Sequence, residues 1–311
     1  MDGRKFQRQY KKSISNYKDW VQKSHAEHHL LFPENLSTEL SLDEVALSDG
    51  ELYTVLTSKK GKGQKGSIVA IVKGTKSEIV IDHLFKISRN LRLKVQEITL
   101  DMASSMKLIA KRCFPNAIQV IDRFHVQKLA TEALQEIRIK HRWEAMDKEN
   151  EWIAESRCKN NPIPLELFEN GDTRKQLLAR SRYLLYKSRE KWTESQSQRA
   201  KILFEHYPDI EKAYNITDQL RQLYNQRIKK DIAMTKLAHW FRDVENTEFK
   251  SFRTLIRTIT LHYSDILNYF TNRSTNASAE SFNAKIKNFR MQLRGVKDRS
   301  FFLFRLTQIF A

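Results

Sequence analysis

Two apolar runs in the first half of the chain, 97–100 and 117–121, each end in an aspartate, Asp101 and Asp122. Between the two runs, apolar residues recur at the spacing of a helix, and a Pro-Asn pair ends that helix. A strand, a helix and a second strand in this order form a βαβ unit with parallel strands. Ligands of open α/β sheets bind beyond the carboxyl ends of such strands, so the pattern predicts a site at the two aspartates.

Three further strand-like runs precede this unit, at 42–47, 51–57 and 67–73. The Ser-Asp-Gly sequence at 48–50 predicts a hairpin turn between the first two, and residues 76–88 show helical spacing. Three antiparallel strands that continue into a βαβ unit are the layout of a ribonuclease-H-like α/β fold, which we therefore predict.

The composition of the sequence changes after this unit. Residues 127–270 contain a single glycine, Gly171, and their pattern predicts long helices with charged faces. Pro162 and Pro164 mark a break among these helices. We expect a large all-helical insertion within the α/β domain. The predicted segments are a basic N-terminal helical segment at 1–40, the first part of the ribonuclease-H-like catalytic domain at 41–126, the helical insertion at 127–270, and the C-terminal part of the catalytic domain at 271–311.

Charge adds a class of partner to this picture. Lys and Arg number 55 against 37 Asp and Glu, a net charge of +18, which favours a polyanion such as nucleic acid over the alternative of a merely basic protein. The two cysteines, Cys113 and Cys158, lie far apart, which excludes a disulfide framework and fits a reducing cytosol. The chain has no apolar run of about 18 residues, so we expect no membrane span.

A polar stripe occurs in a helix predicted to begin near residue 277. Asn276, Glu280, Asn283 and Lys287 recur at the spacing of one helix face. A face with a carboxylate, two amides and a lysine can hold a metal ion and bind phosphates. The alternative is a solvated amphipathic helix.

Three acidic residues of separate elements, Asp43, Asp101 and Glu280, are candidates for one site. In the predicted layout, the first strand, the fourth strand and a helix that follows the sheet meet in space. Phosphodiester chemistry with two Mg²⁺ ions requires such converging carboxylates, since Mg²⁺ prefers oxygen ligands. We therefore expect these three carboxylates to converge.

Several sequence words resemble the DDE transposases of bacterial insertion sequences, and most closely their ISL3 branch. The DRFHV word and the N-x-x-x-E-x-x-N-x-K-I-K word are specific, and the similarity covers roughly residues 36–311. The matching words are Leu42-Asp43-Glu44, the TLDM of 99–102, the IDRFHV of 121–126 and the segment 276–287, with further similarity in the YLLY of 183–186 and the YF of 269–270.

The resemblance implies that Asp43, Asp101 and Glu280 are the catalytic triad and hold two Mg²⁺ ions, with Mn²⁺ as a substitute. The family's second aspartate ends the fourth strand, which favours Asp101, although Asp122 also ends a strand and remains the alternative. The residues then expected to support the site are Asp122, Arg123 and His125, unless Asp122 and Arg123 only form a salt bridge. The residues expected to contact DNA are Asn276, Asn283, Lys285 and Lys287.

The implied activity is metal-dependent cleavage and strand transfer at the ends of an insertion sequence. The alternatives are an inactive DNA-binding relic and a metal-dependent nuclease of the same fold. The resemblance also implies a homo-oligomer on DNA and a cytoplasmic, nucleoid-associated bacterial protein. Such transposases carry an N-terminal zinc-binding and helix-turn-helix region that is not recognised here, so we expect either a separate end-reading DNA-binding protein or a truncated copy.

Overall fold

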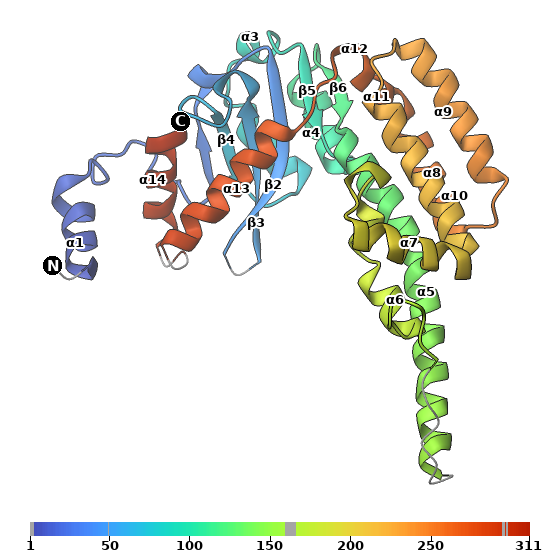
Figure 1. The fold of residues 1–311 in the computed structure, drawn as a ribbon. Helices are drawn as coiled ribbons and strands as arrows, with labels where there is room; N and C mark the ends of the chain where they lie inside the picture. Colours follow the sequence, from blue (N-terminus) through green and yellow to red (C-terminus); the bar gives the residue numbers. More distant parts are fainter. Residues whose placement is uncertain (1–2, 49, 159–165, 294–295, 297) are drawn as a thin grey trace. The chain divides into compact units, whose positions relative to one another are not determined.

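The chain forms two compact units, which are described separately (Figure 1). The first contains Met1–Asp122 and Ser264–Ala311, and the second contains Arg123–Tyr263. Asp49 of the predicted turn and both prolines of the predicted break, Pro162 and Pro164, lie outside the described residues. The computed structural model describes residues 3–48, 50–158, 166–293, 296 and 298–311.

The first unit is built on a six-stranded sheet in the order β1-β4-β3-β2-β5-β6. Strands β2, β3 and β4 pair antiparallel, whereas β5 lies parallel to β2 and β6 lies parallel to β5. The predicted α/β class is therefore confirmed. The strands are β1 (His29–Leu31), β2 (Glu39–Ser48), β3 (Glu51–Ser58), β4 (Ile68–Lys73), β5 (Glu97–Leu100) and β6 (Ile118–Ile121).

Alternation along β2 sends its apolar residues to both faces of the sheet. Leu40 and Leu42 join the core formed with α2 (Ser77–Leu84) and α4 (Ser104–Cys113). Further along β2, Val45 and Leu47 join the opposite core, beneath α13 (Ala277–Gln292) and α14 (Arg299–Phe310). The sheet is therefore covered on both faces, as parallel pairing requires. The remaining helices of this unit are α3 (Arg89–Arg92), α11 (Tyr263–Leu267), α12 (Tyr269–Asn272), α13 (Ala277–Gln292) and α14 (Arg299–Phe310), with α11 beginning one residue before the unit boundary.

The N-terminal segment is less helical than predicted for residues 1–40. Helix α1 (Gly3–Gln9) runs into a π-helical turn, Tyr10–Ile14, and β1 then forms an edge strand. Tyr17, beyond the helical part, packs edge-on against Phe301 and Phe304 of α14. These aromatic contacts join the segment to a small apolar cluster with Phe301 and Phe304.

In its described residues, the second unit consists of helices joined by turns and loops (Figure 1). Its longest helix, α5, runs for 36 residues from Arg123 directly beyond β6. Across the described parts of both units, no helix has the length and apolar character needed to cross a membrane. The helices of the second unit are α5 (Arg123–Cys158), α6 (Arg174–Arg180), α7 (Glu194–His206), α8 (Pro208–Asn225), α9 (Lys230–Glu245) and α10 (Lys250–Leu261), with 3₁₀ turns at Leu184–Tyr186 and Arg189–Lys191.

Candidate active site

Strands β5 and β6 bring the two aspartates of the βαβ unit to the same edge of the sheet. Their register pairs Leu100 with Ile121, and the N–H of Asp122 donates to the carbonyl oxygen of Leu100 at 3.2 Å. Asp101 directly follows β5, and Asp122 directly follows β6. Two carboxylates therefore follow directly from the ends of neighbouring parallel strands.

Strand β2 adds a third aspartate on the other side of β5. The register pairs Ser41 with Thr99, and Asp43 and Asp101 each lie two residues beyond that pair. Because side chains alternate along a strand, Asp43 shares the sheet face of Val45, which α13 covers. The strand order β2-β5-β6 sets Asp101 between Asp43 and Asp122 along this edge.

Helix α13 contacts both outer aspartates. The Nδ2 of Asn283 donates to Oδ2 of Asp43 at 2.7 Å, and the backbone N–H of Asn276 donates to Oδ2 of Asp122 at 3.2 Å. Glu280 lies between these two residues on the same helix, about one turn from each. The contacts thus fix α13 at both ends of the segment that carries Glu280.

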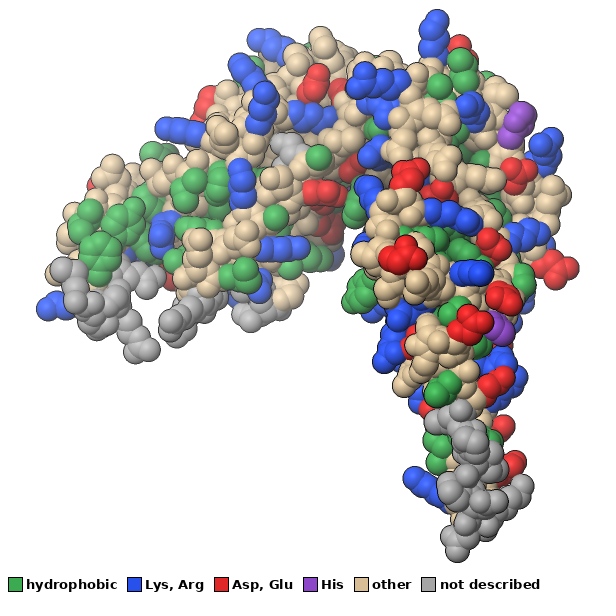
Figure 2. Space-filling view, viewed as in Figure 1, with side chains coloured by type: hydrophobic (Ala, Val, Ile, Leu, Met, Phe, Trp, Pro, Cys, Tyr) green, Lys and Arg blue, Asp and Glu red, His purple; other side chains and the backbone are tan. Residues whose placement is uncertain are grey.

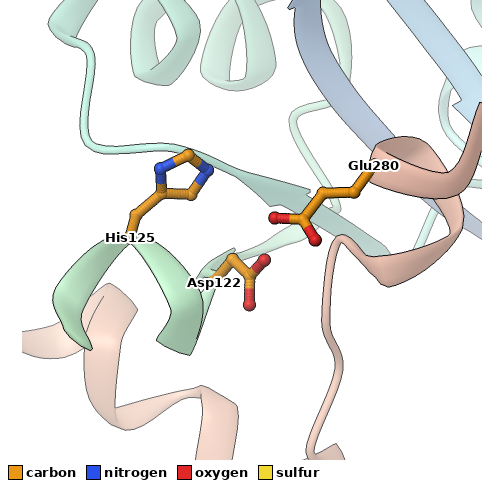
Figure 3. Close-up of side chains that lie close together, drawn as sticks. All are labelled: Asp122, His125 and Glu280. Carbon is orange, nitrogen blue, oxygen red and sulfur yellow. The ribbon is translucent and has the colours of Figure 1, made fainter. Parts of the chain in front are cut away.

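One group of side chains in the described residues has the geometry to hold a metal ion together: Asp122, His125 and Glu280 (Figure 3). Each offers a ligand atom, and these atoms all lie within 4.8 Å of one another. His125 follows Asp122 by three residues, in the first turn of α5. Asp122 is buried, with 1% of its surface exposed. Carboxylate oxygens suit Mg²⁺ and Mn²⁺, and an imidazole is also accepted by Mn²⁺, so the donors fit a divalent cation.

Asp43 and Asp101 are not members of that group, and each makes a local hydrogen bond. Oδ1 of Asp43 accepts the N–H of Glu44 at 2.8 Å, and Oδ1 of Asp101 accepts the N–H of Ala103 at 2.7 Å. Burial raises the pKa of Glu44, and the charges of Asp101 and Asp43 raise it further. Negative charge therefore accumulates where β5 ends beside the middle of β2, an environment that favours a bound cation.

Residues 40–306, most of the chain, match the model of a family described as transposase, the ISL3 branch of the DDE transposases. The chain belongs to the ISL3 family of transposases.

Among known proteins, the ISL3 chain is similar to the transposases for insertion sequence element IS1557 from two strains of Mycobacterium tuberculosis. Each is 28% identical over 183 residues, which cover 58% of this chain and 39% of the relative. The aligned part thus spans about two fifths of the length of these curated relatives. No solved structure matches the chain.

The other predicted site residues of this ISL3 chain differ in exposure. Asn276 is fully buried and Asn283 is nearly so, whereas Lys287 is exposed. Lys285 donates from Nζ to the carbonyl oxygen of Gly63 at 2.7 Å, which ties α13 to the lysine-rich connection between β3 and β4. Arg123 donates to Oδ1 of Asn225 at 3.2 Å, within the second unit.

Asn276 is unusual among the buried residues. Neither polar atom of its side chain has a hydrogen-bond partner, and it stands at the N-terminus of α13 without forming a side-chain cap. An unpaired buried amide costs about 1–3 kcal/mol. Its complete burial beside Asp122 argues against the predicted contact with DNA and makes it a candidate to bind a small ligand of the site.

A polar network around the buried Glu97, which sequence reasoning missed, contacts the segment before α13. Glu97 on β5 pairs with Lys59 at 3.0 Å and accepts from Nδ2 of Asn272 at 3.0 Å. Lys59 also donates to Oγ1 of Thr99 at 2.5 Å. A signal was present in the sequence, because residues 97, 99 and 101 are polar at alternate positions of an otherwise apolar strand.

The titration of Glu97 gives a stability prediction. Burial alone would raise the pKa of Glu97, but hydrogen bonds from Ser274 and Asn272 and the charge of Lys59 outweigh it and lower the pKa below 4.5. A carboxyl group with a lowered pKa in the folded state stabilises the fold at any pH above its pKa in the unfolded state. That stabilisation is lost as the pH falls through the folded-state pKa. We expect Glu97→Gln to lower the free energy of unfolding by about 1.5–3 kcal/mol at pH 7.

The measurement is urea denaturation of the parent and Glu97→Gln at pH 7 and at several values below 4.5. The difference in free energy of unfolding between the two proteins is expected to decrease as the pH falls. Glu78→Gln, at an exposed position of α2, is the matched control and is expected to change little at either pH. A difference that stays constant across this range would contradict a charged Glu97 in the native state.

Proposed function

We propose that this ISL3-family chain cuts DNA at the ends of an insertion sequence and joins the freed ends to target DNA. The observation that carries the proposal is the arrangement of α13 over the strand ends. Helix α13 binds Asp43 through Asn283 and Asp122 through Asn276, and it carries Glu280 between them. Acidic groups from β2, β5, β6 and α13 are thereby gathered at one edge of the sheet.

In this proposal, Asp43, Asp101 and Glu280 hold two Mg²⁺ ions, and Mn²⁺ can replace them. Asp101 ends the strand between those of Asp43 and Asp122, and its charge acts on Glu44, the neighbour of Asp43. Asp122 and His125 are proposed to orient the carboxylate of Glu280, which their own ligand atoms approach within 4.8 Å. The ions, when bound, would activate the attacking oxygen and stabilise the leaving oxygen.

The proposal includes a ribonuclease-H-like catalytic domain, with the second unit inserted between β6 and α13. The sheet order supports this, because an antiparallel β2-β3-β4 set continues into the parallel strands β5 and β6 next to β2. The boundaries of the two units also support it, since the chain leaves the first unit after Asp122 and returns at Ser264.

DNA is proposed as the substrate because the chain carries a net charge of +18. Lys and Arg side chains are distributed over the visible surface of both units, interspersed with acidic ones (Figure 2). Lys287 is exposed on α13 and is a candidate to contact the DNA backbone. Lys285 would contribute to DNA binding indirectly, because its hydrogen bond to Gly63 positions the lysine-rich connection between β3 and β4.

The test is joining of a pre-cut insertion-sequence end to a plasmid in the presence of Mg²⁺ or Mn²⁺. Joined product that disappears with a chelator is expected. Cutting without joining would instead identify a metal-dependent nuclease of the same fold. Neither reaction, in a protein shown to bind the end, would identify a DNA-binding relic and overturn the proposal.

A further inference from the structure

A group of arginines and tyrosines in the second unit has no role in the candidate active site. It includes the YLLY word of residues 183–186. The group lies where α5 packs against α6 and the 3₁₀ turn Leu184–Tyr186. We refer to Arg138, Arg142, Arg182, Tyr183 and Tyr186 as the arginine–tyrosine surface.

The centre of this surface is a buried guanidinium group. Arg138 donates from Nε to Oε1 of Gln135 at 2.6 Å and from Nη1 to the carbonyl oxygen of Leu178 at 2.8 Å. Both acceptors are neutral, so the positive charge of Arg138 is solvated by dipoles and is not cancelled. Gln135 in turn donates to the carbonyl oxygen of Arg182 at 3.3 Å, which joins α5 to the YLLY segment.

Two more positive charges lie close to Arg138. Burial lowers the pKa of Arg138, and Arg142 and Arg182 lower it further, while Tyr186 acts in the opposite direction. Arg142 and Arg182 are exposed. Within the described part of the chain, none of these three arginines forms an ion pair with an acidic side chain. The surface therefore has a concentrated positive charge that an anion would stabilise.

Two aromatic side chains are held outward beside these charges. Leu184 and Leu185 are buried and anchor the segment, whereas Tyr183 is 67% exposed and Tyr186 is 45% exposed. The guanidinium carbon of Arg182 lies 5.5 Å from the centre of the Tyr183 ring. An exposed ring backed by a guanidinium group is a stacking platform for an unpaired base, and the free arginines suit the flanking phosphates.

We propose that the arginine–tyrosine surface binds single-stranded DNA, with a base stacked on Tyr183 and phosphates held by Arg142 and Arg182. The proposal rests on the proposed function in taking DNA as the substrate. It adds a second DNA site, outside the strand-end carboxylates, that recognises unpaired nucleotides such as those of a frayed or nicked element end.

The test uses the full chain, a fluorescein-labelled oligothymidine of about 12 nucleotides and a blunt duplex, with a chelator present. Fluorescence anisotropy is expected to give about tenfold weaker single-strand binding for Tyr183→Ala and near-parent binding for Tyr183→Phe. The double variant Arg142→Ala/Arg182→Ala is expected to weaken binding and to lower the dependence of log K on log salt by about 1.4. Arg257→Ala, an exposed arginine of α10, is the matched control and is expected to bind nearly as the parent does.

Three results would overturn the proposal. The first is parent-like single-strand binding by Tyr183→Ala, and the second is a loss of single-strand binding by Tyr183→Phe as large as that of Tyr183→Ala. The third is a loss of duplex binding by Tyr183→Ala as large as its loss of single-strand binding, which would indicate a contact with the duplex backbone only. The assay requires no metal and no joining. A protein that binds the single strand through Tyr183 but joins no ends would therefore uphold this site and overturn the catalytic proposal.

Discussion

Asp101→Asn is expected to reduce joining of a pre-cut end by at least about a thousandfold, because it removes a proposed ligand of the catalytic ions. Asp122→Asn is expected to cost about 10–100-fold, as is typical of a group that orients a ligand. Both asparagines retain an oxygen that accepts the native hydrogen bond, from the N–H of Ala103 or of Asn276. The fold should therefore survive both substitutions. The measurement is the initial rate of Mn²⁺-dependent joining.

Asp147→Asn provides the control, because Asp147 is an exposed carboxylate of α5. It should join at the parent rate. The reverse order, with Asp122→Asn inactive and Asp101→Asn only weakened, would make Asp122 a direct ligand together with His125 and Glu280. The proposal of a metal-dependent reaction would then stand, but Asp122 would take the place of Asp101 as the second aspartate of the triad.

Phe282→Ala is expected to lower the free energy of unfolding of the first unit by about 3–5 kcal/mol. Phe282 lies on α13, has none of its surface exposed, and packs edge-on against Phe310 with 5.1 Å between ring centres. Truncation leaves a cavity between α13 and the sheet. Because α13 carries Glu280, joining should also fall at temperatures where the parent remains active. Urea denaturation followed by circular dichroism measures the stability loss.

Met291→Ala is the matched control on the same helix, since Met291 is largely exposed. Its effect on stability is expected to stay within about 0.5 kcal/mol. If Phe282→Ala changed the free energy of unfolding no more than Met291→Ala does, this result would contradict the packing of α13 on the sheet. The proposed position of Glu280 would then fail with it.

Hydrophobic periodicity located most of the first unit correctly. The runs at 42–47, 51–57 and 67–73 became β2, β3 and β4, and the helix expected from residue 277 became α13. These elements depend on alternation or helical spacing within one segment, which a sequence displays directly. The edge strand β1, of three residues, is too short to show such a pattern and depends on pairing with β4.

The site was predictable in its residue types but only partly in its grouping. Asp101 and Asp122 were identified as candidates at strand ends, Asp43 within the first strand run, and Glu280 on a polar helix face. The sequence could not state that the ligand atoms of Glu280 and Asp122 approach each other within 4.8 Å. That proximity depends on how α13 crosses the sheet, which residues distant in the chain determine.

By itself, the sequence determined the α/β class, the order of the elements and the family, because these follow from local patterns and from specific words such as DRFHV. The tertiary structure alone decided that Asn276 is buried beside Asp122 and that Lys59 and Asn272 both contact Glu97 of β5. The physical reason is that burial and hydrogen-bond partnership arise between elements after packing, whereas strand and helix propensity act within them.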